Sequence, residues 1–125
     1  MKKLIIGTAQ LVDNYGVTNN NKRNSKKKIF NFLEFFFKNS LYSFDTAINY
    51  GSEKVIGEFI KKNCIKKFKI STKIPSLRAL RENQKLNFIK SQIDSSINNL
   101  NYLDTVYFHD ENDLKFFKSN QSEIN

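Results

Sequence analysis

Short apolar runs alternate along the chain with stretches of helical periodicity. The apolar runs predict four strands, at Leu4–Ile6, Leu41–Phe44, Phe68–Thr72 and Asp104–Phe108. The segments between them place apolar residues three or four positions apart, as amphipathic helices do. This alternation is typical of α/β proteins with a parallel sheet. No linker rich in proline or glycine interrupts the pattern, so we expect one domain over residues 1–125.

Helices are expected in the intervals between the strands. Ser25 is placed to cap a first helix that ends near Lys38, and Ser52 to cap a second. The third helix, Leu86–Leu100, has the clearest pattern, with four apolar side chains expected on its buried face: Ile89, Ile93, Ile97 and Leu100. A fourth helix is expected at Asp113–Lys118, after which the polar tail should fray.

Four βα units amount to half of a (β/α)₈ TIM barrel, and this half-barrel is the architecture that we expect. A four-stranded, doubly wound open sheet fits the same pattern. The dinucleotide-binding version of that sheet is disfavoured, because the turn directly after the first strand has one glycine, Gly7, where a G-x-G-x-x-G fingerprint needs three. The chain also has no P-loop, no zinc-ligand spacing and no nucleophile elbow, so no metal site is expected.

The net charge raises a different class of function. The 21 Lys and Arg against 12 Asp and Glu give +9, which is enough to consider nucleic acid or an anionic membrane as a partner. The basic clusters at 21–28 and 66–69 motivate a nucleic-acid-binding hypothesis. We favour a compositional explanation, because Lys, Asn, Ile and Phe are all abundant together. The lysines at 26–28 are expected to form the solvated start of the first helix, and no nucleic-acid partner is expected.

The cysteine content and the hydropathy of the sequence indicate where in the cell the protein is expected to be located. Cys64 is the only cysteine, so an intrachain disulfide is impossible and a reducing, cytoplasmic location is the default. No segment approaches the roughly 18 apolar residues that a membrane-spanning helix needs. We therefore expect a cytoplasmic protein without a membrane partner.

Four polar residues follow the predicted strands closely. Asp45 and Tyr50 come after the second strand, Lys73 after the third and His109 after the fourth. Because the carboxyl ends of parallel strands converge on one rim, we expect these side chains to meet. Each has an ordinary structural interpretation when taken alone, such as a turn at Asp45 or a packing aromatic at Tyr50. Their combination at one rim favours a chemical role.

The four residue types suit the reduction of a carbonyl by hydride, which leaves an alkoxide in need of a proton. A phenol is a weak acid, with an ordinary pKa near 10. An adjacent ammonium stabilises the phenolate form, and a carboxylate holds the ammonium in place. A neutral imidazole can donate a hydrogen bond to the substrate oxygen and orient it beside the phenol.

Four stretches of the chain resemble the aldo-keto reductase family: Leu4–Gly16, Phe44–Gly57, Ile70–Pro75 and Ser95–Asp110. The D-T-A-x-x-Y-G motif of the family is matched residue for residue from Asp45 to Gly51. The four stretches occur in the family's order and cover nearly the whole chain. The resemblance implies a (β/α)₈ barrel and the NADPH-dependent reduction of a small-molecule aldehyde or ketone.

The resemblance also implies a role for each candidate residue. Tyr50 would be the general acid, Lys73 would modulate it, Asp45 would hold the lysine, and His109 would orient the substrate. For the cofactor, it implies that Gly7, Thr8 and Asp45 lie at the nicotinamide end of NADPH.

Two departures from the family pattern are visible. The common pattern has one more residue before the Ser-Glu pair that opens the second helix, whereas Gly51, Ser52 and Glu53 are contiguous here, so a small displacement of Tyr50 is expected. The family also binds most of the dinucleotide with its second half, and this chain stops at Asn125, about where that half would begin.

Two interpretations remain open. The first is a truncated reductase with its catalytic residues present. The second is a non-catalytic half-barrel remnant or interaction module. In either case the exposed sheet edges would allow self-association or pairing with a second-half chain.

Overall fold

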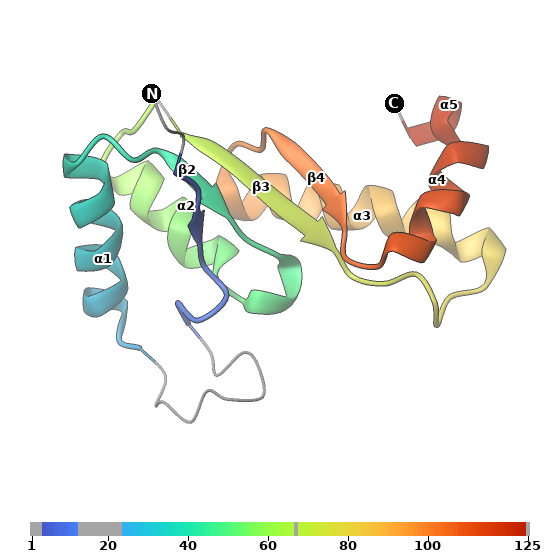
Figure 1. Cartoon of the computed structure of the whole chain (residues 1–125), viewed down its shortest axis with the longest axis horizontal. Coiled ribbons are helices and arrows are strands. Elements are labelled where there is room, and N and C mark those ends of the chain that lie inside the picture. Colours follow the sequence, from blue (N-terminus) through green and yellow to red (C-terminus); the bar gives the residue numbers. More distant parts are fainter. Residues whose placement is uncertain (1–3, 13–23, 67, 125) are drawn as a thin grey trace.

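The computed structural model describes residues 4–12, 24–66 and 68–124, without the side chains of 123 and 124. Four strands form one sheet in chain order, and each pairs in parallel with the next (Figure 1). The strands are β1 (Ile6–Gly7), β2 (Ser43–Asp45), β3 (Lys69–Ile74) and β4 (Thr105–Phe108). The expected half-barrel is therefore confirmed, and β1 and β4 are its edge strands.

Helices alternate with the strands along the chain: α1 (Lys26–Lys38), α2 (Glu53–Lys62), α3 (Glu82–Leu100), α4 (Leu114–Ser119) and α5 (Gln121–Ile124). Short 3₁₀ turns, 48–50 and 111–113, follow β2 and β4. Helix α5 lies in the polar tail, where the sequence pattern predicted no helix. No helix in the described part of the chain combines the length and the apolar character that crossing a membrane requires.

The strands bury one face of the sheet under the helices. Successive strand residues point to opposite faces, and in β3 the buried residues Ile70 and Ile74 alternate with the more exposed Lys69 and Lys73. The main core lies on the buried face and joins side chains from β1 to β3 with others from α1, α2 and α3. The opposite face, called the open face below, carries Lys69, Lys73 and the other residues of the same alternation.

Helix α1 forms as its sequence predicts. The Ser25 hydroxyl accepts a hydrogen bond from the Lys28 N–H at 3.3 Å and so caps the first turn. Ile29 and Leu33 are buried one turn apart. The lysines at 26–28 are exposed, as expected for the solvated start of this helix.

Helix α3 differs from its prediction at two points. It begins at Glu82, four residues early, because Arg81 and Gln84 exchange backbone and side-chain hydrogen bonds that close a first turn without any apolar residue. Ile97, expected in the buried stripe, is 44% exposed. The reason is that α3 is the last long helix at the β4 edge of the sheet, so its outer side is incompletely covered.

Helices α2 and α3 approach each other closely at Gly57. A Cβ atom built on Gly57 would lie 1.8 Å from the Asn99 carbonyl oxygen, so only glycine fits. Asn101 ends α3 in the left-handed conformation, with φ of 62°, and its side-chain amide donates to the Gly57 carbonyl at 3.2 Å. This contact fixes α2, and with it the segment between β2 and α2.

Candidate active site

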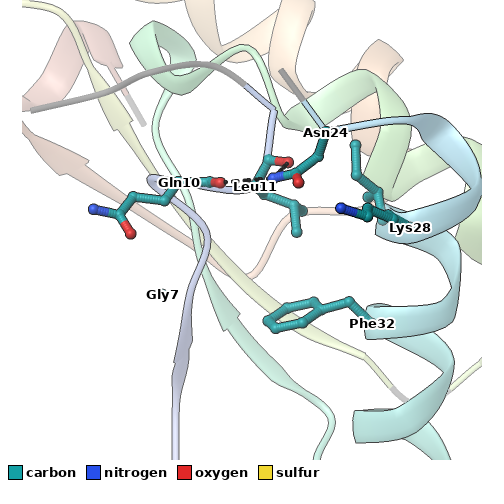
Figure 2. Close-up of a pocket in the computed structure, with 7 residues that line it drawn as sticks. Gly7, Gln10, Leu11, Asn24, Lys28 and Phe32 are labelled. Carbon is teal, nitrogen blue, oxygen red and sulfur yellow. Dashed lines mark hydrogen bonds between the residues drawn. The ribbon is translucent and has the colours of Figure 1, made fainter. Parts of the chain in front are cut away.

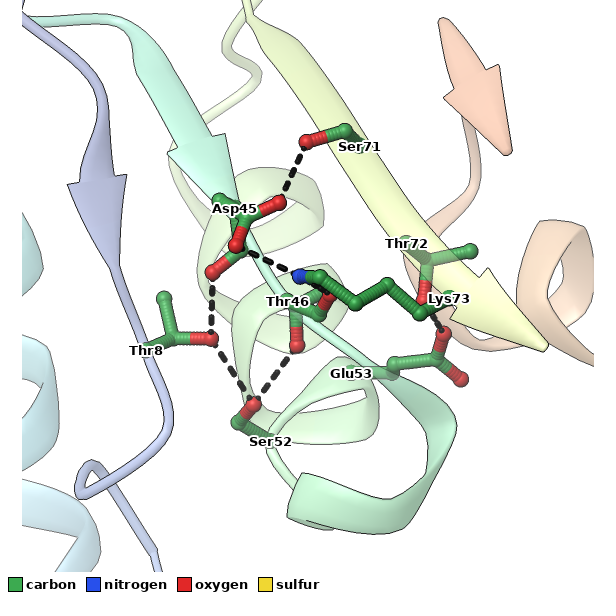
Figure 3. Close-up of polar contacts among 8 residues, drawn as sticks. All are labelled: Thr8, Asp45, Thr46, Ser52, Glu53, Ser71, Thr72 and Lys73. Carbon is green, nitrogen blue, oxygen red and sulfur yellow. Dashed lines mark hydrogen bonds and ion pairs between the residues drawn. The ribbon is translucent and has the colours of Figure 1, made fainter. Parts of the chain in front are cut away.

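Lys73 and Asp45 form the centre of the candidate site (Figure 3). The Lys73 ammonium donates to Asp45 Oδ2 at 2.5 Å and to the Thr46 carbonyl at 2.9 Å. The two side chains are 21% and 33% exposed, so the pair is only partly screened by water. Strand β3 extends two residues further than predicted, which places Lys73 inside the strand rather than after it.

Ser71 completes the coordination of the Asp45 carboxylate. Its hydroxyl donates to Asp45 Oδ1 at 2.8 Å, so both carboxylate oxygens accept hydrogen bonds. Ser71 is also the register partner of Asp45 across β2 and β3. Our sequence analysis missed this residue, although its position two residues before Lys73 places it on the same face of the strand.

Tyr50 lies close to the same ammonium. It ends the 3₁₀ turn after β2, and Gly51 follows in the left-handed conformation with φ of 67°. The Lys73 Nζ atom is 5.5 Å from the centroid of the Tyr50 ring, within the usual range of a cation–π contact. The structure therefore brings together three of the four residues that the sequence singled out.

His109 follows β4 on the neighbouring strand. Its backbone N–H donates to the Ile74 carbonyl at 3.0 Å, which holds the residue at the end of the sheet, and its side chain is exposed. Among the contacts of the described residues, none joins the His109 imidazole to Lys73 or Asp45. Its orienting role therefore stays a prediction.

Three buried hydroxyl groups form a chain of hydrogen bonds that ends at the backbone carbonyl of Asp45. Thr8 Oγ1 donates to the Asp45 carbonyl at 3.1 Å, Ser52 Oγ lies 3.1 Å from Thr8 Oγ1, and Thr46 Oγ1 lies 2.8 Å from Ser52 Oγ. Each hydroxyl has a single proton. Since Thr8 uses its own on the carbonyl, Ser52 must donate to Thr8 and Thr46 to Ser52. This chain joins β1, β2 and the start of α2.

The hydroxyl chain also corrects one expectation. Ser52 occupies the position before α2, but its side chain makes no capping hydrogen bond to that helix. It is fully buried and bonded to Thr8 and Thr46 instead. The tertiary hydrogen bonds have replaced the local cap that the sequence predicts.

Glu53 is a buried carboxylate on the helix side of the sheet. Only 4% exposed, it accepts hydrogen bonds from Thr72 Oγ1 at 2.7 Å, from Ser96 Oγ at 2.8 Å and from the Asn99 amide at 3.3 Å. Its place in the first turn of α2 also favours the negative charge. The network connects α2, β3 and α3, and it stabilises the strand that carries Lys73.

Beyond the rim, Asp110 follows His109 and has a perturbed titration. The backbone N–H and the side-chain amide of Asn112 donate to its carboxylate at 3.0 and 2.8 Å, and Ser76 Oγ donates at 3.1 Å. These hydrogen bonds hold the pKa of Asp110 below its ordinary value. The carboxylate thereby links the loop after β3 to the turn after β4.

Gly7 borders a pocket at the free side of β1 (Figure 2). The pocket has a volume of about 480 Å³ and is lined by Gly7, Gln10, Leu11, Asn24, Lys28, Ile29 and Phe32. Among the described residues, apart from the two chain neighbours of Gly7, no atom lies within 4 Å of the place where a Cβ on Gly7 would stand. The backbone at Gly7 is therefore open toward the pocket. Thr8 is buried and its hydroxyl is engaged, so only its backbone is suited to contact a ligand.

Comparisons with solved structures find aldo-keto reductase barrels. A putative aldo-keto reductase from Pseudomonas aeruginosa matches with a TM-score of 0.72 and 18% identity, over 93% of this chain and 46% of that one. A thermostable aldo-keto reductase, solved with the inhibitor epalrestat, matches with a TM-score of 0.66 and 19% identity, over 98% of this chain and 46% of that one.

A putative 2,5-diketo-D-gluconic acid reductase B matches with a TM-score of 0.60 and 22% identity, over 86% of this chain and 33% of that one. At these identities the likeness shows the fold alone. The chain spans less than half the length of each of these three structures.

A comparison with curated proteins finds no match. A family model, described as the aldo/keto reductase family, matches residues 3–114, which include all of the candidate site residues. This match covers most of the chain, and it agrees with the half-barrel fold and with the D-T-A-x-x-Y-G motif. The chain therefore belongs to the aldo/keto reductase family.

Proposed function

We propose that this chain carries the proton-donating site of an NADPH-dependent carbonyl reductase that converts an aldehyde or ketone to an alcohol. The observation that supports it best is the position of the Lys73 ammonium, which contacts the Asp45 carboxylate and the Tyr50 ring together. Lys73 lies on β3, far in sequence from the segment that carries Asp45 and Tyr50, and the three residue types suit one proton transfer.

Each residue has a distinct task in this proposal. NADPH, when bound, supplies the hydride. The Tyr50 hydroxyl donates its proton to the oxygen of the substrate, where negative charge develops. The Lys73 ammonium stabilises the phenolate that remains on Tyr50. Asp45 holds the Lys73 side chain in place, and Ser71 holds Asp45.

His109 is proposed to orient the carbonyl group of the substrate. A neutral imidazole N–H can donate to the carbonyl oxygen and polarise it. The exposed side chain at the end of β4 leaves room for a substrate on the rim. This assignment rests on the family motif and on the position of the strand end.

Three residues are proposed to hold the nicotinamide end of the cofactor. Gly7 offers an open backbone beside the pocket of Figure 2, and Thr8 follows it. Asp45 is partly exposed on the same rim. The hydroxyl of Thr8 contributes indirectly, because its hydrogen bond to the Asp45 carbonyl fixes the strand ends β1 and β2 against each other.

A second candidate function is a non-catalytic half-barrel that binds a partner. It is favoured by one observation, namely the large apolar side chains exposed at the two ends of the sheet, such as Phe35 and Tyr107. The two functions differ in one measurable property, which is the binding of NADPH.

Titration of NADPH with the purified chain, followed by nicotinamide fluorescence, separates the two. Saturable binding, with NADPH oxidation that depends on an added aldehyde or ketone, is the result expected of the reductase. Keto-sugar acids belong in the first substrate panel, because one solved relative is named for such a substrate. A folded chain that neither binds nor oxidises NADPH would contradict the proposal and favour the non-catalytic function.

A further inference from the structure

Both ends of the sheet have backbone groups without a strand partner in the described structure. The strand order is β1-β2-β3-β4, so β1 and β4 each pair on one side only. All three existing pairs are parallel. The β4 edge of one copy is therefore suited to pair with the β1 edge of another in the same sense as the existing pairs.

Apolar side chains are exposed at the β1 end of the molecule. Ile5, which precedes β1, is 60% exposed, and Phe35 on α1 is 61% exposed. Four large apolar residues are exposed at this end: Leu4, Ile5, Phe32 and Phe35. They lie on the edge strand segment and on the helix that follows it, where the next βα unit of a barrel would pack.

The β4 end also carries four exposed large apolar residues. Tyr107 on β4 is 51% exposed, and the segments on either side of this strand in the chain contribute the others. The four residues are Ile97, Tyr102, Tyr107 and Leu114. In the described part of the chain, the exposed large apolar residues all belong to these two ends, and β2, β3 and α2 carry none. This distribution indicates two docking surfaces rather than scattered surface residues.

The two ends also differ in charge. In the described residues 4–12 and 24–38, which include β1 and α1, there are four basic residues and one acidic residue. Residues 101–122, which include β4 and α4, contain four acidic and two basic residues. Opposite ends therefore attract, whereas two β1 ends would repel each other. The charges favour a head-to-tail contact.

We propose that two copies of this chain pair head to tail, β4 of each against β1 of the other, and close an eight-stranded parallel barrel. Two identical contacts related by a twofold axis leave no free edge. Eight strands are the number at which a parallel βα sheet closes with a filled interior. The open faces would then form the barrel interior, and both copies of the Lys73–Asp45 pair would lie on one rim. This assembly does not depend on the proposed reduction.

The mass of the chain in solution tests the assembly. Light scattering coupled to size-exclusion chromatography should give a mass near twice 14.7 kDa over a range of concentrations. A monomer would overturn the proposal. A series of larger, concentration-dependent species would also overturn it, because that result means that the contact is open-ended.

Single substitutions at each end make the test specific. Phe35→Lys at the β1 end and Leu114→Glu at the β4 end should each convert the dimer to a monomer, with the circular dichroism spectrum unchanged. Two matched controls should remain dimeric. Asn31→Lys is on the side of α1 that faces α2, and Lys61→Glu is on α2, away from both ends.

Mixing the two monomeric variants distinguishes head-to-tail pairing from pairing of like ends. In the mixture, the Leu114 surface of one copy meets the Phe35 surface of the other with neither residue substituted. In the second contact of this heterodimer, the side chain introduced by Phe35→Lys faces the one introduced by Leu114→Glu, and their charges are opposite. A heterodimer should therefore form on mixing, and failure of the mixture to dimerise would contradict the head-to-tail arrangement.

Discussion

The Lys73 ammonium on β3 donates a 2.5 Å hydrogen bond to the Asp45 carboxylate on β2. The two residues are 28 positions apart in sequence, and parallel pairing of the two strands brings them together. The pair is partly buried, and Ser71 and Thr46 supply the remaining hydrogen bonds. The site is therefore a consequence of strand register, and its stability can be measured without any ligand.

The first prediction concerns the coupling between these two residues. Asp45→Asn should destabilise the chain by about 1–2 kcal/mol, because the partly buried Lys73 ammonium loses its counter-charge. Lys73→Met and the double variant complete a cycle, in which we expect a coupling of about 1 kcal/mol in urea unfolding. The exposed pair Glu34–Lys38, at 2.8 Å, serves as the control and should couple by at most about 0.5 kcal/mol. Equal coupling in the two pairs would show that burial does not strengthen the Asp45–Lys73 pair.

The second prediction compares two glycines. Gly57→Ala should destabilise the chain by about 2–4 kcal/mol, because the new methyl group would lie 1.8 Å from the Asn99 carbonyl and force α2 and α3 apart. The methyl group of Gly7→Ala meets no atom of the described residues within 4 Å, apart from the chain neighbours, and should change stability by less than about 0.5 kcal/mol. Denaturant midpoints of the two variants provide the measurement. If Gly7→Ala were the more damaging of the two, the packing described for α2 and α3 would be wrong.

The third prediction tests the buried Glu53 network. Glu53→Gln should destabilise the chain by about 1–3 kcal/mol, because an amide NH₂ would face hydrogen-bond donors that now meet a carboxylate oxygen. The exposed Glu82, also in the first turn of a helix, is the control, and Glu82→Gln should have a much smaller effect. Thermal unfolding of both variants decides the matter, and a neutral Glu53→Gln would mean that the three hydrogen bonds contribute little.

The fourth prediction is a pH dependence at Asp110. Its pKa is held below the ordinary 3.8 by the Asn112 and Ser76 hydrogen bonds. The carboxylate therefore stabilises the fold fully above pH 3.8, and this contribution is lost as the pH falls through the lower, folded-state pKa. Asp110→Asn lacks this titration, so its stability should fall less steeply below about pH 4 than that of the wild-type chain. Parallel unfolding curves for the two proteins across that range would show that Asp110 is not linked to folding.

Much of the fold could be predicted from local patterns. The Ser25 cap and the buried Ile29 and Leu33 of α1 are encoded within one segment, and the structure confirms them. The meeting of Asp45, Tyr50 and Lys73 follows from a general property of parallel sheets, that strand ends converge. These features depend only on the periodicity of the apolar residues and on the topology of a parallel sheet.

The remaining features depend on contacts between distant segments. Ser52 has the sequence of a helix cap, but Thr8 and Thr46 offer its hydroxyl stronger tertiary partners. The partners of Glu53 come from β3 and α3, which no local pattern indicates. Ile97 fits the buried stripe of its helix, yet the sheet ends beside it.

The most direct test of the proposed function is the turnover of wild-type chain and Tyr50→Phe with NADPH and an aldehyde. Phenylalanine keeps the ring beside Lys73 and removes the hydroxyl group that would donate the proton, and we expect the fold to be retained. We expect Tyr50→Phe to turn over about 10²–10⁴-fold more slowly than the wild-type chain, the usual contribution of a general acid. Equal turnover by the two proteins would contradict the assignment of Tyr50 as the proton donor.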